Sequence, residues 1–305
     1  MTEQQSPPRP GQAFSPEPGV RGVLADNPSP MTQRGTLSWI VGTGRVALID
    51  PGPDDPAHLR ALLAALAPGE AVSHIFVTHA HLDHSGLARR LSEATGAPVL
   101  AFGGARAGRS ACMQALFPGE TSAGTEGTDL SFSPDETIAD GETVAGPDWA
   151  LRALHTPGHF GNHLCLAWGS AIFSGDHVMG WSSSIVAPPD GDMGDYMASL
   201  DRLSAEGAAR LYPAHGDAVH DPAARIAELA QHRRQREAQI LAALRSGPGD
   251  AMTIARHLYA DIPPRLLRAA AMNVLAHLID LHSRNAAESD GLPGPDAVFA
   301  LRAGG

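Results

Sequence analysis

Three histidines and one aspartate are concentrated in six residues of this sequence. They form the pattern His79-x-His81-x-Asp83-His84, which is separated from the apolar run 75–77 by Thr78 alone. Imidazole nitrogens and carboxylate oxygens are ligands that zinc and related divalent metals prefer. A strand that ends in a loop can aim His79 and His81 at one point, and the turn that follows can aim Asp83 and His84 at a second point nearby. This spacing predicts two adjacent metal ions rather than one.

Metal-type side chains recur at three later positions, each after a short apolar segment. His159 follows a Pro-Gly turn, Asp176 follows the run 171–175, and His215 follows the run 211–214. Functional groups on loops at strand ends are typical of layered enzymes. Each position alone is a weak signal, but together they favour a metal site over a surface histidine cluster. We interpret three further histidines near these positions as structural: His155, His163 and His177.

Strand-like and helical patterns alternate over the first two thirds of the chain, which predicts an α+β fold. The runs 36–41 and 46–49 predict a hairpin. Residues 56–67 and 85–95 have the spacing of helices, and a second group of strands is expected over 137–174. Residues 1–19 are Pro-rich and polar, so we expect a flexible tail there.

The C-terminal part is predicted to be mainly helical. Helices are expected over 223–245, 253–260 and 266–283, and a short strand over 297–301. This order predicts a small winged-helix-like helical domain over 220–305. Between residues 222 and 284 nine Arg stand against five acidic residues, which allows a nucleic-acid reader. The alternative, which we favour, is a docking domain that keeps its Arg side chains on a solvated face and forms one wall of the substrate cleft.

Composition narrows the function classes. The 305 residues carry a formal net charge of −11, which is not the pattern of a protein that grips nucleic acid over a broad face. All 22 basic residues are Arg, so Schiff-base and lysine-nucleophile chemistry are excluded. Two cysteines, Cys112 and Cys165, indicate a reducing compartment. The chain shows no signal-peptide pattern and no apolar run of membrane-spanning length, so we expect a cytoplasmic protein without a membrane partner.

The ligand pattern resembles that of the metallo-β-lactamase superfamily of binuclear metallohydrolases. The resemblance implies an αββα sandwich over residues 20–219 and zinc at both positions, with iron or manganese as alternatives because the ligands are only N and O. Asp50, after the apolar run 46–49, is implied to orient the histidine loop without binding metal. The implied ligands are His79, His81 and His159 for one metal, Asp83, His84 and His215 for the other, and Asp176 as a bridge.

Three other segments narrow the resemblance to the β-lactamase-like protein 2 family, over residues 20 to 300. They are Asn27–Thr36, the run 232–241 and Asn273–Leu278. That family includes a mitochondrial endoribonuclease that cuts single-stranded RNA and fungal thioesterases that release polyketides from carrier proteins. Its usual Asn-Thr-Tyr is replaced here by Leu37-Ser38-Trp39, near the substrate mouth.

The resemblance implies a hydrolase in which a metal-bound hydroxide attacks a carbonyl carbon or a phosphorus. Asp83 would orient this nucleophile and handle its proton. The substrate would be a single-stranded RNA phosphodiester or a small acyl thioester or ester. A metal-bearing binding protein is a third alternative, which the complete set of seven ligands disfavours.

Overall fold

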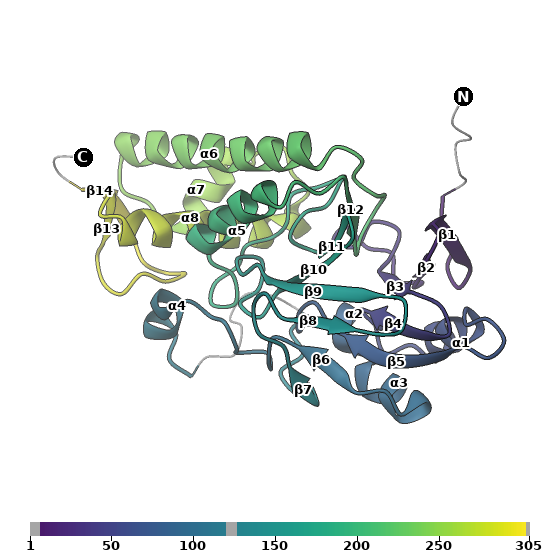
Figure 1. The fold of residues 1–305 in the computed structure, drawn as a ribbon. Coiled ribbons are helices and arrows are strands. Elements are labelled where there is room, and N and C mark those ends of the chain that lie inside the picture. The colour runs from purple at the N-terminus through teal and green to yellow at the C-terminus, as the bar shows by residue number, and fades with distance from the viewer. Residues whose placement is uncertain (1–6, 120–126, 303–305) are drawn as a thin grey trace.

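Two β-sheets packed face to face form the centre of the molecule in the computed structural model, which describes residues 7–119 and 127–302 (Figure 1). The strands of the first sheet are, in spatial order, β1 (Ala13–Glu17), β2 (Val20–Leu24), β3 (Leu37–Val41), β4 (Arg45–Ile49), β5 (Ala71–Phe76), β6 (Val99–Ala101) and β7 (Glu136–Thr137). Neighbours from β1 to β4 are antiparallel and those from β4 to β7 are parallel.

The second sheet is shorter and is also mixed. Its strands are, in spatial order, β12 (Arg210–Pro213), β11 (Ala171–Gly175), β10 (Leu164–Trp168), β9 (Ala150–His155) and β8 (Thr143–Ala145). Only β11 and β12 are parallel. The helices of this part of the chain are α1 (Pro56–Ala64), α2 (Leu82–Ser85), α3 (Ala88–Thr95), α4 (Ala111–Leu116) and α5 (Met193–Ala205).

The molecule has four layers because both faces of each sheet are apolar and must be covered. One buried cluster lies between the sheets and joins residues such as Trp39 and Ile49 to Leu166 and Phe173. A second cluster packs the outer face of the first sheet against α1 and α3. A third packs the second sheet against α5 and the helix that follows β12. This helix–sheet–sheet–helix order agrees with the expected sandwich.

Aspartates begin several helices and explain where those helices start. Asp55, Asp192 and Asp250 each accept a hydrogen bond from a backbone N–H in the first turn of α1, α5 and the helix 251–258. Asp221 does the same for the helix 222–246, and proline follows at the first helical position. These are ordinary N-cap arrangements, and their residue types are readable in the sequence.

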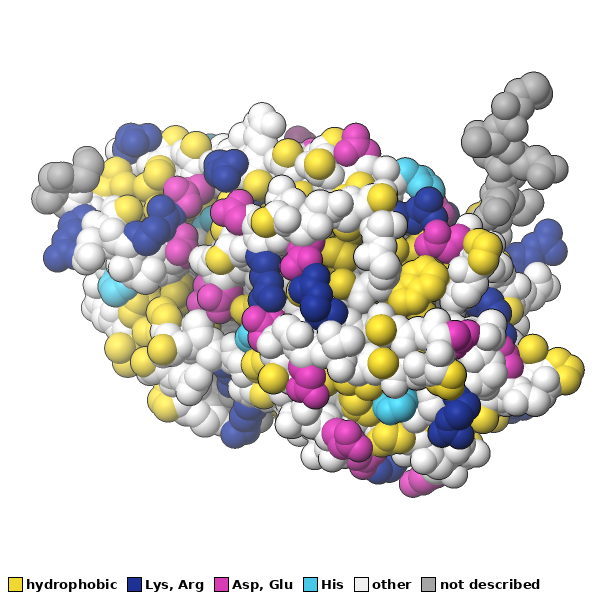
Figure 2. Space-filling model, in the orientation of Figure 1, with side chains coloured by type: hydrophobic (Ala, Val, Ile, Leu, Met, Phe, Trp, Pro, Cys, Tyr) yellow, Lys and Arg dark blue, Asp and Glu magenta, His cyan; other side chains and the backbone are white. Residues whose placement is uncertain are grey.

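The C-terminal elements form a separate group beside the second sheet (Figure 1). They are α6 (Pro222–Ser246), α7 (Ala251–Leu258), the short 3₁₀ helix Pro264–Leu266, α8 (Leu267–Ser283), β13 (Ala287–Ser289) and β14 (Phe299–Leu301). On the face shown in Figure 2, Arg side chains are interspersed with acidic ones. Arg284 of the C-terminal group pairs with Glu237 and Asp280. Among the residues that the structure describes, no helix is long and apolar enough to cross a membrane.

Three expectations from the sequence need correction. Residues 13–17, expected in the flexible tail, form β1 because they pair with β2; residues 1–6 of that tail lie outside the described residues. The helix expected over 85–95 begins only at Ala88, as α3, because Gly86 and Leu87 form a turn that packs against residues 52–54, and Ser85 instead ends α2. Arg233, expected on a solvated face, is only 2% exposed. The domain boundaries near residues 19 and 220 remain predictions.

Trp39 connects the two sheets, so its truncation should destabilise the whole sandwich. Its ring lies 5.0 Å from that of Tyr212 and 5.9 Å from that of Phe173, and its indole N–H donates to the Pro213 carbonyl. We expect Trp39→Ala to lower the free energy of unfolding by about 3–5 kcal/mol, as is usual for a buried aromatic residue. Urea unfolding of the metal-free protein measures this. Leu63→Ala on the partly exposed face of α1 is the control and should change it by less than about 1 kcal/mol.

Candidate metal centre

The ends of four strands bring the predicted ligands together. His79 and His81 follow β5, His159 follows β9, Asp176 directly follows β11, and His215 follows β12. Asp83 and His84 lie in the first turn of α2, rather than in an irregular turn. All seven residues therefore reach one region from both sheets, as the sequence pattern predicts.

Two glycines permit this approach. Gly158 has φ +136°, and a Cβ there would meet backbone atoms of Tyr196 at 2.3–2.5 Å. Gly175 has φ +49°, and a Cβ would lie 2.6 Å from the His163 ring. Both positions need glycine because side chains would clash in a backbone conformation that they rarely adopt. Each glycine directly precedes a candidate ligand, His159 or Asp176.

The first cluster consists of three imidazoles and one carboxylate oxygen. The Nδ1 atom of His81 lies 2.8 Å from Nε2 of His79 and 3.3 Å from Nε2 of His159. The same His159 nitrogen lies 3.6 Å from Oδ2 of Asp176. Ligands bound at about 2.0–2.1 Å in a tetrahedron are separated by roughly 3.3 Å, so these separations suit one metal ion.

The second cluster uses the other oxygen of Asp176. Its Oδ1 lies 3.2 Å from Nε2 of His215 and 3.5 Å from Nε2 of His84. Oδ2 of Asp83 lies 3.3 Å from the same His215 nitrogen and 3.5 Å from the same His84 nitrogen. Asp176 therefore presents one oxygen to each cluster, which is the arrangement required of a bridging ligand.

Buried polar atoms without a hydrogen-bond partner indicate that the two clusters can hold cations. His84 Nε2 and Asp176 Oδ1 are buried and make no hydrogen bond within the described residues. Buried polar atoms of this kind normally have a partner. Together with the N and O donor set and the two groups of converging atoms, they indicate that the residues present fit a pair of divalent metals.

The outer nitrogens of four candidate ligands are held by oxygen atoms. His84 Nδ1 donates to Asp50, and His79 Nδ1 lies 3.0 Å from the Thr78 hydroxyl, which itself donates to Asp50. His159 Nδ1 donates to the Ile185 carbonyl at 2.6 Å, and His215 Nδ1 donates to the Gly35 carbonyl at 3.1 Å. A carbonyl accepts only from N–H, so Nδ1 of His159 and of His215 carries a hydrogen and Nε2 of each ring faces the cluster. Asp50 contacts the histidine loop as its implied role requires.

The two clusters differ in protonation. Burial disfavours the charged form of His215, but the carboxylates of Asp176 and Asp83 outweigh it and raise its pKa to about 10. The same carboxylates also outweigh burial at His84 and raise its pKa. Burial and the neighbouring His159 instead lower the pKa of His81 to about 3. A cation must therefore displace protons from the second cluster, whereas the imidazoles of the first are neutral.

A cavity of about 320 Å³ opens onto both clusters. Candidate ligands form its floor. Its walls combine apolar side chains with four hydroxyls: Pro30, Met31, Met179, Trp181 and Ile185, and Ser29, Thr32, Ser182 and Ser183. Among the described residues, none beyond His215 lines it. The expectation that the C-terminal domain forms a wall of the cleft is therefore wrong for this cavity, because the 179–185 segment lies between that domain and the site.

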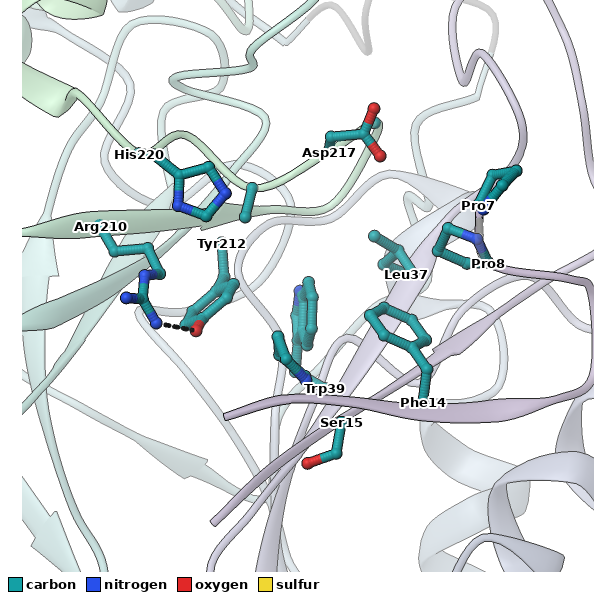
Figure 3. Close-up of a pocket in the computed structure, with 13 residues that line it drawn as sticks. Pro7, Pro8, Phe14, Ser15, Leu37, Trp39, Arg210, Tyr212, Asp217 and His220 are labelled. Atoms are coloured by element: carbon teal, nitrogen blue, oxygen red, sulfur yellow. Dashed lines mark hydrogen bonds between the residues drawn. The ribbon is translucent and has the colours of Figure 1, made fainter. Parts of the chain in front are cut away.

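A larger cavity of about 680 Å³ lies at the edge of the sandwich and contains none of the candidate ligands (Figure 3). Phe14 and Leu37 point into it from the first sheet, and Tyr212 closes it from β12. The Tyr212 hydroxyl is occupied by Glu17 and Arg210. The smaller cavity is consequently the one with reactive chemistry.

Several residues near the site were not predicted from the sequence. The Thr36 hydroxyl donates to Asp83 at 3.1 Å, and the Ser184 hydroxyl donates to the carbonyls of Asp176 and His177. The histidines interpreted as structural do not belong to either cluster: His163 accepts from the Asp176 N–H, and His155 stacks on Phe102. Hydroxyls and carbonyls have no ligand-type spacing, so only the Ser-rich run at 182–184 offered a signal.

Two known protein families match separate parts of the chain. A family model of the metallo-beta-lactamase superfamily matches residues 31–215, and one of the beta-lactamase associated winged helix domain matches residues 251–293. The chain is 32% identical over 270 residues to a beta-lactamase-like protein 2 homolog of Drosophila melanogaster, covering 85% of this chain and 86% of that protein.

Two further similarities concern a fungal enzyme and a solved structure. The chain is 33% identical over 235 residues to an atrochrysone carboxyl ACP thioesterase of Aspergillus chevalieri, covering 75% of this chain and 66% of that protein. It superposes on a metallo-beta-lactamase family protein from Thermus thermophilus with a TM-score of 0.74 at 26% identity, covering 94% of this chain and all of that one. These matches confirm the resemblance, the α+β fold class and the winged-helix domain expected from the sequence.

The clusters predict both the stoichiometry and the pH dependence of metal binding. We expect close to two transition-metal ions per chain, and fewer in His81→Ala and Asp176→Ala. Because His84 and His215 hold protons, affinity at the second cluster should rise as pH increases towards about 10, with proton release on binding. Calorimetry in buffers of different ionisation enthalpy measures this release.

The control for metal content is His257→Ala on the exposed surface of α7, which should leave it unchanged. Equal metal content in His81→Ala and the parent protein, or equal proton release from both clusters, would contradict this assignment.

Proposed function

The chain belongs to the metallo-beta-lactamase superfamily of hydrolases, and on this premise we propose that it is a zinc-dependent hydrolase of acyl esters or thioesters. The observation that carries the substrate class is the cavity at the metal centre, which combines a polar floor with apolar walls. The function rests on two parts, the ligand set and the substrate pocket.

In this proposal His79, His81 and His159 hold one zinc ion, and Asp83, His84 and His215 hold the other. Asp176 contributes one oxygen to each. Bound zinc would supply an activated water and positive charge for the oxyanion that develops at the substrate carbonyl. The N and O donors also suit iron or manganese, so zinc identity is part of the proposal.

Asp83 is the candidate for orienting the attacking water and taking its proton. Its side chain is 28% exposed, against 11% for Asp176, and it lines the cavity where a substrate carbonyl would lie. The Thr36 hydroxyl, positioned by Asn27, donates to Oδ2 of Asp83 and fixes its rotamer. The other carboxylate oxygen remains available to accept a proton from water.

The walls of the cavity favour an apolar acyl group over a nucleic acid. Met31, Met179 and Trp181 surround the floor, and no Arg of the described chain lines the cavity. Recognition of single-stranded RNA depends on cationic side chains along the backbone and aromatic platforms for the bases. A single indole with methionine and proline neighbours suits a hydrocarbon chain better. The similarity to a fungal thioesterase supports the same class.

A substrate panel tests the proposal. We expect the metal-loaded protein to have its highest kcat/KM on thioesters or oxygen esters of apolar acyl groups, and lower values on lactones and on single-stranded RNA. Chain-length series should show kcat/KM rising with acyl length until the cavity is filled. Cleavage of RNA faster than every ester, or no turnover of any member with two metals bound, would refute the assignment.

Replacement of Asp83 tests its role separately. Asp83→Asn keeps the shape of the side chain but removes its charge and basicity. We expect kcat to fall by at least ~10², the lower range for a positioned acid–base group, with a smaller change in KM. The assay is steady-state kinetics on protein loaded to two metals per chain.

Asp54→Asn, a neutralised surface carboxylate that pairs with Arg90, is the matched control and should retain its kcat. A fully metallated Asp83→Asn protein with the parent kcat would show that this carboxylate does not handle the proton.

A further inference from the structure

The segment 184–186 touches two of the candidate ligands from outside the metal clusters. The Ile185 carbonyl accepts from Nδ1 of His159 at 2.6 Å. The Ser184 hydroxyl donates to the backbone carbonyl of Asp176 and, at 3.0 Å, to that of His177. A shift of this segment would therefore move His159 and Asp176 together.

The C-terminal helices hold the same segment from its far side. Arg233 on α6 donates to the Ser184 carbonyl, and its NH1 donates to Oδ1 of Asn273 on α8 at 3.1 Å. The same Asn273 oxygen accepts from the Val186 N–H at 3.0 Å. Asn273 is itself oriented by its side-chain N–H, which donates to the Ala269 carbonyl.

The burial of Arg233 is costly and needs a reason. The residue is 2% exposed, and among the described residues its guanidinium forms hydrogen bonds and a ring contact but no ion pair with a carboxylate. Its charge is met only by oxygen dipoles and by the Tyr196 ring, whose centroid lies 5.0 Å from its Cζ. Burial of a cation without a counter-charge is unfavourable, and an apolar residue would pack here more readily. The hydrogen bonds to the 184–186 segment account for the presence of a cation.

We propose that Arg233 and Asn273 are positioning residues for the metal centre. Through the 184–186 segment they keep the Nε2 lone pair of His159 and the carboxylate of Asp176 aimed at the clusters. The C-terminal domain thus acts on catalysis by clamping this segment and not by contacting substrate. The inference rests on the proposed function for its catalytic consequence, and on the hydrogen bonds alone for its structural one.

Metal titration gives the first test. Arg233→Met removes the guanidinium but keeps a side chain of similar length. Arg233→Lys keeps the positive charge but replaces the guanidinium with a single ammonium group. We expect zinc affinity at the His79–His81–His159 cluster to fall roughly 10–100-fold in Arg233→Met, the usual effect of losing a residue that orients a metal ligand. Arg233→Lys should recover part of the affinity. His81→Ala and His215→Ala, which each remove one cluster, assign the two binding steps.

Arg236→Met is the matched control, on the same helix one turn further along. Arg236 lies over the Tyr259 ring at 4.0 Å and, among the described residues, makes no hydrogen bond to the 184–186 segment, so its loss should leave both affinities unchanged. Asn273→Ala provides a second route to the same segment if Arg233→Met does not fold, and should weaken the same binding step. Thermal unfolding of each variant separates loss of the fold from loss of the clamp.

A second readout does not require metal. Nitrogen-15 spectra of the metal-free protein report which nitrogen of His159 carries the proton. We expect a single Nδ1–H tautomer in the parent and in Arg236→Met, and a mixture in Arg233→Met. Unchanged His159 spectra and parent affinities in folded Arg233→Met would overturn the proposal.

The two readouts distinguish this inference from the proposed function. A parent protein that binds two metals yet hydrolyses no ester would refute the function and leave the positioning role supported by the titration. Because Asp176 presents an oxygen to each cluster, the second binding step should also weaken in Arg233→Met, but less than the first. Weakening of the second step by as much as the first would overturn the positioning role, because a general loosening of the fold predicts that result.

Discussion

Asp50 is a buried carboxylate at the end of β4 that orients histidines of both clusters. Its Oδ1 accepts from the Thr78 N–H at 2.7 Å, and its Oδ2 accepts from the Thr78 hydroxyl at 2.8 Å and from His84 Nδ1 at 2.9 Å. The Thr78 hydroxyl in turn contacts Nδ1 of His79 and so orients its ring. The residue has φ +51°, a conformation that costs of order 1–3 kcal/mol for a non-glycine residue. The hydrogen bonds of Asp50 offset this cost, and they cannot form if the chain turns differently after β4.

The opposite side of the centre is held by main-chain carbonyls instead of a carboxylate. Ile185 and Gly35 each fix one imidazole, and the Leu37 N–H donates to the carbonyl of Ala214, beside His215. These segments come from distant parts of the chain. The ligands therefore depend on the closure of the whole sandwich and on the C-terminal helices behind it. A rigid support of this kind is what a site needs when misplacement by about 1 Å lowers activity 100-fold.

The sequence predicted the site better than it predicted its support. The seven candidate ligands were identifiable because metal binding demands particular side chains and because strand ends place them, whereas Asp50 was identified through the resemblance to the superfamily. Ile185 and Gly35 act through backbone carbonyls, which any residue has, so no pattern marks them. Arg233 was expected in solvent because its surrounding helix is rich in charge, and only tertiary packing determines which of its faces is buried. β1 was missed because proline and glycine in residues 7–19 indicate a tail, whereas pairing with β2 depends on the rest of the sheet.

The protonation states of the two clusters indicate which cluster would bind a metal ion first. The imidazoles of His79, His81 and His159 have pKa values lowered mainly by burial, so they are neutral ligands at neutral pH. His84 and His215 are instead cations that neutralise Asp83 and Asp176, and a metal must displace their protons before it can bind. A cation held by the first cluster would lie beside Asp176 and would add positive charge near both histidines, which would favour release of those protons. Binding at the first cluster would thus prepare the second, because Asp176 presents one oxygen to each.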